Sequence, residues 1–181
     1  SFSVIPVPAN INLSFNAEAD RIQFMDFNLT EAMGTVQLRE GIARLTGVKF
    51  NLLDGAFAMT GTYDPRNLQR PLYDFDMGID KLSIQSAAQG FSLVKKIAPI
   101  AGAAKGLFSM KFNIAGAMDS HLSPDASSVD ANGLITIHDA GITGSKAISA
   151  VTALTRLKDT EQVTLKDAKI SATVIDGKLQ V

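Results

Sequence analysis

The side chains best suited to metal binding gather in one polar stretch near residue 120. Asp119, His121 and Asp125 supply two carboxylates and an imidazole, and both kinds of group are common zinc ligands. Their spacing matches no established metal-binding pattern, and the serines and proline around them are typical of a solvated loop. We therefore expect a polar loop over 119–130 and no bound metal ion.

Paired carboxylates offer a second kind of chemistry, because two of them can act as general acid and base. Asp74 and Asp76 fall on one face of a strand expected at 71–82, about 7 Å apart by the rise of a strand, and Asp80 follows nearby. No His, Arg or Tyr joins them on that face, so a solvated outer surface is the better interpretation. His138 lies within another expected strand, where a lone histidine is usually structural.

Other catalytic and cofactor signatures are missing from the sequence. The chain has no cysteine, which excludes a thiol nucleophile, a disulfide and a cysteine metal site. It contains no Gly-x-Ser-x-Gly elbow, no P-loop and no dinucleotide fingerprint. We interpret the glycine- and alanine-rich stretch 102–106 as a helix-ending linker. We predict a protein that is not an enzyme and holds no cofactor.

The composition narrows the class of partner. With 17 basic and 18 acidic residues the formal net charge is −1, which argues against a nucleic-acid binder and against a polybasic membrane-surface patch. No apolar run approaches the roughly 18 residues that span a bilayer. The chain lacks an initiator Met and stops inside a strand pattern at 179–181. We expect a piece of a longer protein, with any targeting or anchoring segment outside it.

Alternating apolar and polar residues dominate the chain and predict strands. The pattern is clearest in 48–64, where two arms flank Asp54-Gly55, a strong hairpin signal. The final stretch, 168–181, repeats this design around Asp176-Gly177. We expect a turn at Asp20-Arg21 and a bulge near Met25-Asp26. The expected strands are 10–19, 22–29, 32–39, 42–53, 56–63, 71–82, 106–117, 133–138, 163–165, 168–175 and 178 onward.

Helical spacing replaces alternation in two places. Ser83 can cap a helix over about 83–100, with Lys95 and Lys96 near its end, and a second helix is expected over 145–157. Residues 32–41 resemble residues 131–140, and both copies lead to an Asp-Gly turn. These features predict a mainly β (α+β) fold, a large curved antiparallel meander with an internal repeat and two short helices on one face. A single domain would hold two meander units, 10–82 and 106–181, joined by the first helix.

Large apolar side chains line one face of this sheet. One interpretation is a closed core beneath the two helices. The other is an open groove that holds acyl chains, because so wide a sheet has more apolar face than two short helices can cover, and uncovered apolar area usually marks a binding site. Methionine suits such a surface because it adapts its shape. The candidate lipid-facing residues are Phe57, Met59, Phe75, Met77, Phe91, Val94, Phe108, Met110 and Phe112.

Several short stretches carry a resemblance to a known family. They are Leu53-Asp54-Gly55, Gly61-Thr62-Tyr63-Asp64, Pro71-Leu72-Tyr73-Asp74-Phe75, and the run from Asn132 to Ala140. Together with the order of the elements, they resemble the C-terminal region of AsmA-like proteins over nearly the whole chain. The resemblance implies a periplasmic domain of a bacterial protein anchored in the inner membrane by one N-terminal helix. Relatives of the TamB and YhdP type are thought to carry phospholipid to the outer membrane along β-grooves, and the family implies no catalytic residues.

Two functions fit these expectations. The first is a groove that binds or conducts phospholipid, or another acyl-chain ligand, in outer-membrane biogenesis. The second is a non-enzymatic scaffold that assists the assembly of outer-membrane proteins through its sheet edges. In either case we expect a location in the bacterial cell envelope, and membrane contact through parts of the protein outside this chain. The discriminating observation is whether the apolar face is open or covered.

Overall fold

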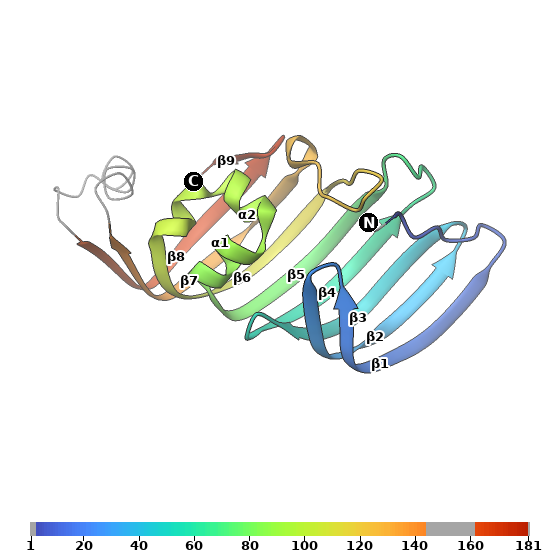
Figure 1. The fold of residues 1–181 in the computed structure, drawn as a ribbon, viewed down its shortest axis with the longest axis horizontal. Coiled ribbons are helices and arrows are strands. Elements are labelled where there is room, and N and C mark those ends of the chain that lie inside the picture. The colour runs from blue at the N-terminus through green and yellow to red at the C-terminus, as the bar shows by residue number, and fades with distance from the viewer. Residues whose placement is uncertain (1–2, 144–161, 181) are drawn as a thin grey trace.

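The computed structural model describes residues 3–143 and 162–180. Its strands form one antiparallel meander of nine strands, each paired with its neighbours in sequence (Figure 1). The mainly β fold predicted from alternation is therefore confirmed. Strands β5 and β6 flank the helical connection and pair directly, so the sheet runs unbroken through the two predicted meander units. The strands are β1 (Asn12–Phe24), β2 (Phe27–Arg39), β3 (Ile42–Leu52), β4 (Gly55–Asp64), β5 (Leu72–Ser83), β6 (Ala104–Ala117), β7 (Asp130–Thr143), β8 (Gln162–Ile175) and β9 (Lys178–Gln180).

The β5–β6 connection holds helices α1 (Ile84–Gly90) and α2 (Ser92–Ile97) and the 3₁₀ helix η1 (Pro99–Ala103). The Ser83 hydroxyl caps α1 by accepting the Ser86 N–H at 3.2 Å. The single helix predicted over 83–100 is broken at Phe91, whose backbone is extended, and its ring packs against Phe27 and Phe57 of the sheet. The helix predicted over 145–157 lies outside the described residues.

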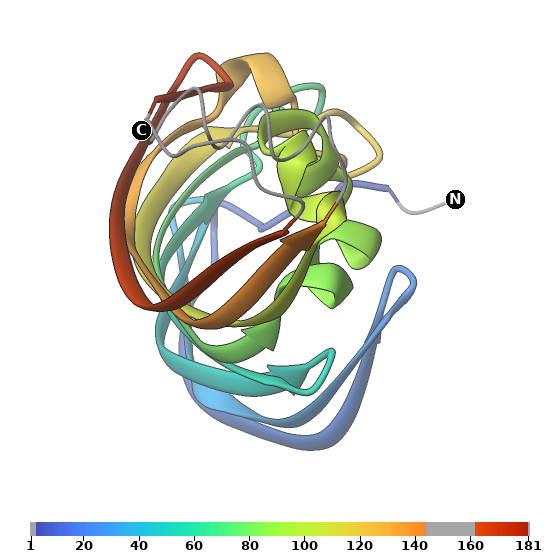
Figure 2. The same ribbon diagram turned by 90° about the vertical axis from the view of Figure 1, so that its left-hand side faces the viewer.

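The sheet curls around these helices, which lie within its concave side (Figure 2). We call the side that contacts the helices the inner face and the opposite side the outer face. Successive strand residues point to opposite faces, so the alternation seen in the sequence sends most large apolar residues to the inner face and most polar ones to the outer face. Met33 and Leu134 are apolar exceptions on the outer face. The helices seal part of the inner face around two buried clusters, one formed by Leu52, Phe57, Leu82 and Ala87 and the other by Ile84, Ala104, Ile137, Ala140 and Ile142.

The β3–β4 turn differs by one residue from the expected Asp54-Gly55. Leu53 and Asp54 take the two positive φ values, 51° and 63°, and Leu52 pairs with Gly55 at the end of the ladder. Gly55 is needed inside β4, because a Cβ there would lie 3.0 Å from the Leu82 side chain. The Asp176-Gly177 turn between β8 and β9 is confirmed by the closing pair of Ile175 and Lys178.

Strand β1 runs straight through Asp20-Arg21, so the turn predicted there is wrong. The hairpin turn is Met25-Asp26, closed by Phe24 opposite Phe27, where a bulge was expected. The irregularity lies instead at Asp20 of β1 and at Glu31, the residue opposite it on β2, which has a φ of 51°. We call it the phase slip, because after it the even-numbered residues of β1 face inward in place of the odd-numbered ones.

The pairing partners in the neighbouring strands β2 and β3 locate the phase slip. Ala19 lies opposite Ala32, which is buried, and Arg21 lies opposite Thr30. Thr30 in turn lies opposite Asn51 of the outer face, and opposite residues share a face. Two residues therefore separate the inward-facing Ala19 and Ile22, where a regular strand would have one.

Candidate functional site

Apolar rows cross the inner face at right angles to the strands. Residues that lie directly opposite each other on paired strands share a face, so the strand register defines each row. The first row consists of Phe50, Phe57, Ile79, Met110, Ile135 and Ile170, the second of Val48, Met59, Met77, Phe112, Gly133 and Ala172, and the third of Leu45, Gly61, Phe75, Ile114, Ala131 and Val174. Every side chain in these rows is apolar across six strands.

The candidate lipid-facing residues divide between a covered and an uncovered region. Phe57 is 5% exposed and lies beneath the helical connection, with its ring 5.2 Å from Phe50 and 6.4 Å from Phe91. Phe108 packs against both buried clusters. Phe57 is therefore buried in the core that the helices seal, while Phe91 and Phe108 pack against the buried clusters and stay half-buried.

The uncovered region keeps part of its apolar surface accessible. Five candidates, Met59, Phe75, Met77, Met110 and Phe112, lie on the inner face of β4, β5 and β6 and are half-buried. Of these, Met77 also packs against the buried cluster around Leu52 and Phe57. The remaining candidate, Val94, is half-buried on α2. Toward the β1 edge the exposure rises, with Leu13 at 46% and Phe15 at 41%. The helices thus cover the inner face near one end of the strands, and the adjoining part of the inner face remains partly accessible.

Two tyrosines mark the polar end of the open region, and sequence reasoning did not single them out. Tyr63 and Tyr73 lie opposite each other on β4 and β5, and both hydroxyl oxygens are buried without a hydrogen-bond partner among the residues that the structure describes. Burial raises the pKa of both phenols. The Ile5 backbone approaches the Tyr63 hydroxyl closely enough to oppose this pKa rise, but the contact falls short of hydrogen-bond geometry.

The outer face carries a hydrogen-bonded trio that contains His138. Ser109 Oγ donates to Asp80 Oδ1 at 2.9 Å, accepts the Lys81 N–H at 3.1 Å and lies 2.7 Å from His138 Nε2. Since the one hydroxyl hydrogen goes to the carboxylate, His138 must donate through Nε2. In nucleophilic triads the imidazole stands between serine and carboxylate and takes the serine proton. Here the serine stands in the middle, so the trio ties irregular strands together and does not activate Ser109.

The paired carboxylates of β5 are also held by a neighbour. Asn113 Nδ2 donates to Asp74 Oδ1 at 3.0 Å and lies 3.3 Å from Asp76 Oδ1. Both aspartates are exposed on the outer face, as expected from the strand pattern. An open depression of about 1000 Å³ crosses this face, with Lys49, Lys111 and Glu18 among its lining residues. The hollow therefore lies on the charged side of the sheet, although Phe50, Phe57, Ile79 and Met110 of the first apolar row also contribute to its lining.

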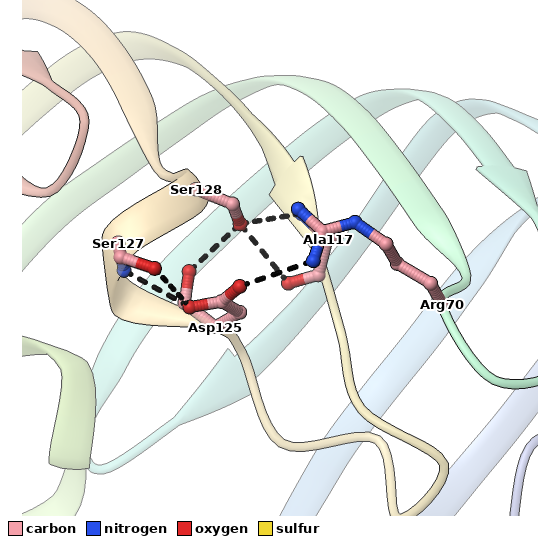
Figure 3. A network of polar contacts seen from close by, with 5 residues as sticks. All are labelled: Arg70, Ala117, Asp125, Ser127 and Ser128. Atoms are coloured by element: carbon pink, nitrogen blue, oxygen red, sulfur yellow. Dashed lines mark hydrogen bonds and ion pairs between the residues drawn. The ribbon is translucent and has the colours of Figure 1, made fainter.

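The acidic residues of the β6–β7 loop bind their own loop. Asp125 Oδ1 accepts the Ser127 N–H and hydroxyl at 3.1 and 2.6 Å, and Arg70 Nη1 lies 3.3 Å from Asp125 Oδ2 (Figure 3). Ser128 Oγ accepts the Ala117 N–H at 2.9 Å and donates to the Asp125 carbonyl at 2.7 Å. These bonds fix the loop against the ends of β5 and β6.

Asp119 also accepts hydrogen bonds within this loop, near the start of the loop. Its Oδ1 accepts the N–H groups of His121 and Ser123 at 2.8 and 3.0 Å. Over the described ranges, no group of three His, Cys, Asp or Glu side chains is arranged to hold a metal ion. Asp119, His121 and Asp125 are neighbours in sequence, but both carboxylates engage loop donors.

These bonds predict a pH dependence of the loop. The hydrogen bonds from Ser127 lower the pKa of Asp125, and the backbone N–H groups of Ser123 and His121 lower the pKa of Asp119, both from 3.8. A carboxyl group with a lowered folded-state pKa stabilises the fold fully above its ordinary pKa, and this stabilisation is lost as the pH falls through the lowered value. We therefore expect the free energy of unfolding, measured with urea, to fall as the pH is taken from about 5 to about 2.

Asp125→Asn is the matched variant for this experiment, because it keeps the shape but removes the titrating group. It should unfold more easily at pH 7 and lose less stability than the parent chain between these pH values. An identical pH dependence in the variant and the parent would contradict the assignment of Asp125.

Comparison with known proteins adds no relative. Neither the family models nor the curated proteins nor the solved structures include a match to this chain. Within residues 3–143 and 162–180, no helix has the length and apolar character needed to cross a membrane.

Proposed function

We propose that the uncovered inner face binds the acyl chains of a phospholipid, and that the chain is the periplasmic part of an AsmA-like, inner-membrane-anchored protein that serves outer-membrane biogenesis. The observation that carries this proposal is the set of uninterrupted apolar rows, whose middle members Met59, Met77 and Phe112 keep accessible surface. Exposing so much apolar surface to water is unfavourable, because burying apolar surface contributes about 25 cal/mol per Å² to the free energy of folding or binding. An apolar ligand that covers the rows would gain this free energy.

The chemistry of the face supports a chain-like ligand. Methionine and phenylalanine adapt to acyl chains without fixing a single shape, and the rows contain no charged group that an acyl chain would leave unpaired. The polar outer face keeps the other side of the sheet in water. A sheet with one apolar, partly open side and one charged side suits a protein that shields lipid tails.

Binding, and not catalysis, is the role we propose for the polar residues as well. The serine, histidine and aspartate side chains of the outer-face trio satisfy one another, and the loop aspartates accept bonds from loop N–H and hydroxyl groups. None of these groups belongs to the apolar rows.

The proposal is tested by the variant Met59→Asp, with Ala58→Asp as its matched control. These neighbours lie on opposite faces of β4, and Ala58 lies opposite Lys49, so the same charge enters the apolar face in one variant and the outer face in the other. We expect Met59→Asp to reduce uptake of a fluorescently labelled phospholipid at least tenfold, because an acyl chain would have to contact a carboxylate. Ala58→Asp should bind like the parent chain.

Circular dichroism and thermal unfolding would show that both variants fold. The parent chain, purified without detergent, should carry phospholipid detectable by mass spectrometry of its organic extract. Absence of bound lipid together with equal probe binding by the two variants would overturn the proposal.

A second candidate function is favoured by one observation. Strand β1 pairs only with β2, which leaves its other edge free along the described part of the chain. A free strand edge can recruit another strand, as a scaffold for outer-membrane proteins would. Capture of such a partner by lipid-free protein would favour this role over lipid binding.

A further inference from the structure

The free edge of β1 has properties that select a particular partner. The strand spans Asn12–Phe24 and contains no proline, so nothing in its backbone prevents pairing. Natural sheets usually protect such an edge by shortening it, covering it or twisting it away. At the opposite edge of the sheet β9 is short, Lys178–Gln180. Strand β9 covers only the end of β8, at Thr173, Val174 and Ile175, so among the described strands β1 and the rest of β8 have long unpaired edges. Of these two, β1 is unpaired along its whole length on that side.

The edge is also apolar on its inner face. Phe15, Ile22 and Phe24 are 41%, 40% and 40% exposed, although residues of the same kind are half-buried or buried in the middle of the sheet. A partner strand would cover these side chains on one flank. It would have to present apolar residues at the positions opposite them and polar residues between.

The phase slip at Asp20 limits which strand can do this. A regular strand alternates strictly, so if its apolar residues matched Phe15 on one side of the slip, its polar residues would oppose Ile22 and Phe24 on the other. Within the sheet, β2 solves this problem with a slip of its own at Glu31, opposite Asp20. A partner of the free edge needs a slip at the corresponding place.

A second copy of β1 meets this requirement in an antiparallel register. When Phe15 lies opposite Phe24 of the second copy, Ala17 lies opposite Ile22, and the slips of the two copies fall side by side at the centre. Every pair outside the slips then joins residues of the same face, inner with inner and outer with outer. The arrangement has twofold symmetry about an axis normal to the sheet, so each pair occurs twice.

The same register places opposite charges face to face. Glu18 and Arg21 both lie on the outer face, since their partners in β2 are Met33 and Thr30, which belong to that face. In the antiparallel pair, Glu18 of each copy lies directly opposite Arg21 of the other. Opposite charges at such positions stabilise pairing, and like charges weaken it.

We propose that two copies of this chain associate through β1 in this register, forming one continuous sheet whose two inner faces join into a single apolar surface. The proposal is independent of lipid binding, since it depends on the edge strand alone. It predicts a concentration-dependent dimer with isologous contacts and no interface elsewhere.

A charge exchange tests the register. Glu18→Arg places two arginines opposite each other, and Arg21→Glu places two glutamates opposite each other, in both cases twice per dimer. Each single variant should raise the dimer dissociation constant at least tenfold in sedimentation velocity at low salt. The double variant carrying both changes restores opposite charges and should recover dimerisation. Equal behaviour of the singles and the double would overturn the proposal, as would a parent chain that stays monomeric up to about 100 µM.

Disulfide trapping provides a second, geometric test, which the absence of native cysteine makes clean. The variant Ala17→Cys with Ile22→Cys should form a covalent dimer on mild oxidation, because these positions face each other across the interface. Leu13→Cys with Ala17→Cys is the matched control and should stay monomeric, since neither position meets the other in this register. A cross-linked control or an uncross-linked test variant would contradict the proposal.

Discussion

Replacing Phe57 by aspartate is expected to unfold the protein. The side chain is 5% exposed, packs with Leu52, Leu82 and Ala87, and contacts the rings of Phe50 and Phe91. The variant would lose the packing of a large aromatic residue, worth about 3–5 kcal/mol, and would also bury a carboxylate without a partner. Few domains tolerate such a loss, because total stability is about 5–15 kcal/mol.

The neighbouring residue provides the control for this experiment. Ala58 lies on the outer face opposite Lys49 and Gly78, so Ala58→Asp places the same charge in water beside a lysine. It should change the free energy of unfolding by less than about 1 kcal/mol. Chemical denaturation followed by circular dichroism would measure both variants. A folded Phe57→Asp variant of near-parent stability would show that the helices do not seal this part of the inner face.

Gly106→Ala is expected to cause the second large loss of stability. The residue has a φ of +126° and pairs with Ala140, and a Cβ added to it would lie 1.7 Å from the carbonyl oxygen of Asp139. That contact is with backbone, so only separation of β6 and β7 could relieve it. Separation would also disturb the cluster that contains Ala104 and Ala140. We expect a loss of about 3 kcal/mol or more from strain and repacking together.

A glycine nearby in the chain is the matched control. Gly102 belongs to η1, and a Cβ added to it would have no atom within 4 Å. Gly102→Ala should be neutral or slightly stabilising, because alanine restricts the unfolded chain more than glycine does. Equal thermal unfolding of the two variants would contradict the close approach of β6 and β7 at Gly106.

The two proposals for function depend on different parts of the molecule and can fail separately. Lipid binding depends on the open part of the apolar rows, and Met59→Asp changes only that surface. Association of two copies depends on the free edge of β1, where Glu18 and Arg21 lie on the outer face. If both hold, the paired sheets would present a surface twice as wide for acyl chains.

The strand pattern was predictable because alternation is a local property. A residue's face in a strand depends on whether its position is odd or even, so Met59, Met77 and Phe112 could be assigned to one apolar face before their neighbours were known. The Asp176-Gly177 turn and the Ser83 cap were also predictable, since each depends on a few adjacent residues. For the same reason the outer position of Asp74 and Asp76 was correctly expected.

The remaining features depend on contacts between distant segments. The turn moved to Leu53-Asp54 because Gly55 must pass close to Leu82, and the helix broke at Phe91 where its ring packs against Phe27. Ser109 was missed because Asp80 and His138 approach it from two other strands. None of these approaches can be read from local spacing.

Alternation and turn chemistry are local, so they specify a meander with one apolar side before any long-range contact is known. How much of that side is covered follows from packing between segments that are distant in sequence. Coverage depends on where the β5–β6 connection packs, which buries Phe57 and leaves Met59, Met77 and Phe112 half-buried. The physical reason is that burial is a property of pairs of surfaces, and a pattern along one strand specifies only one of them.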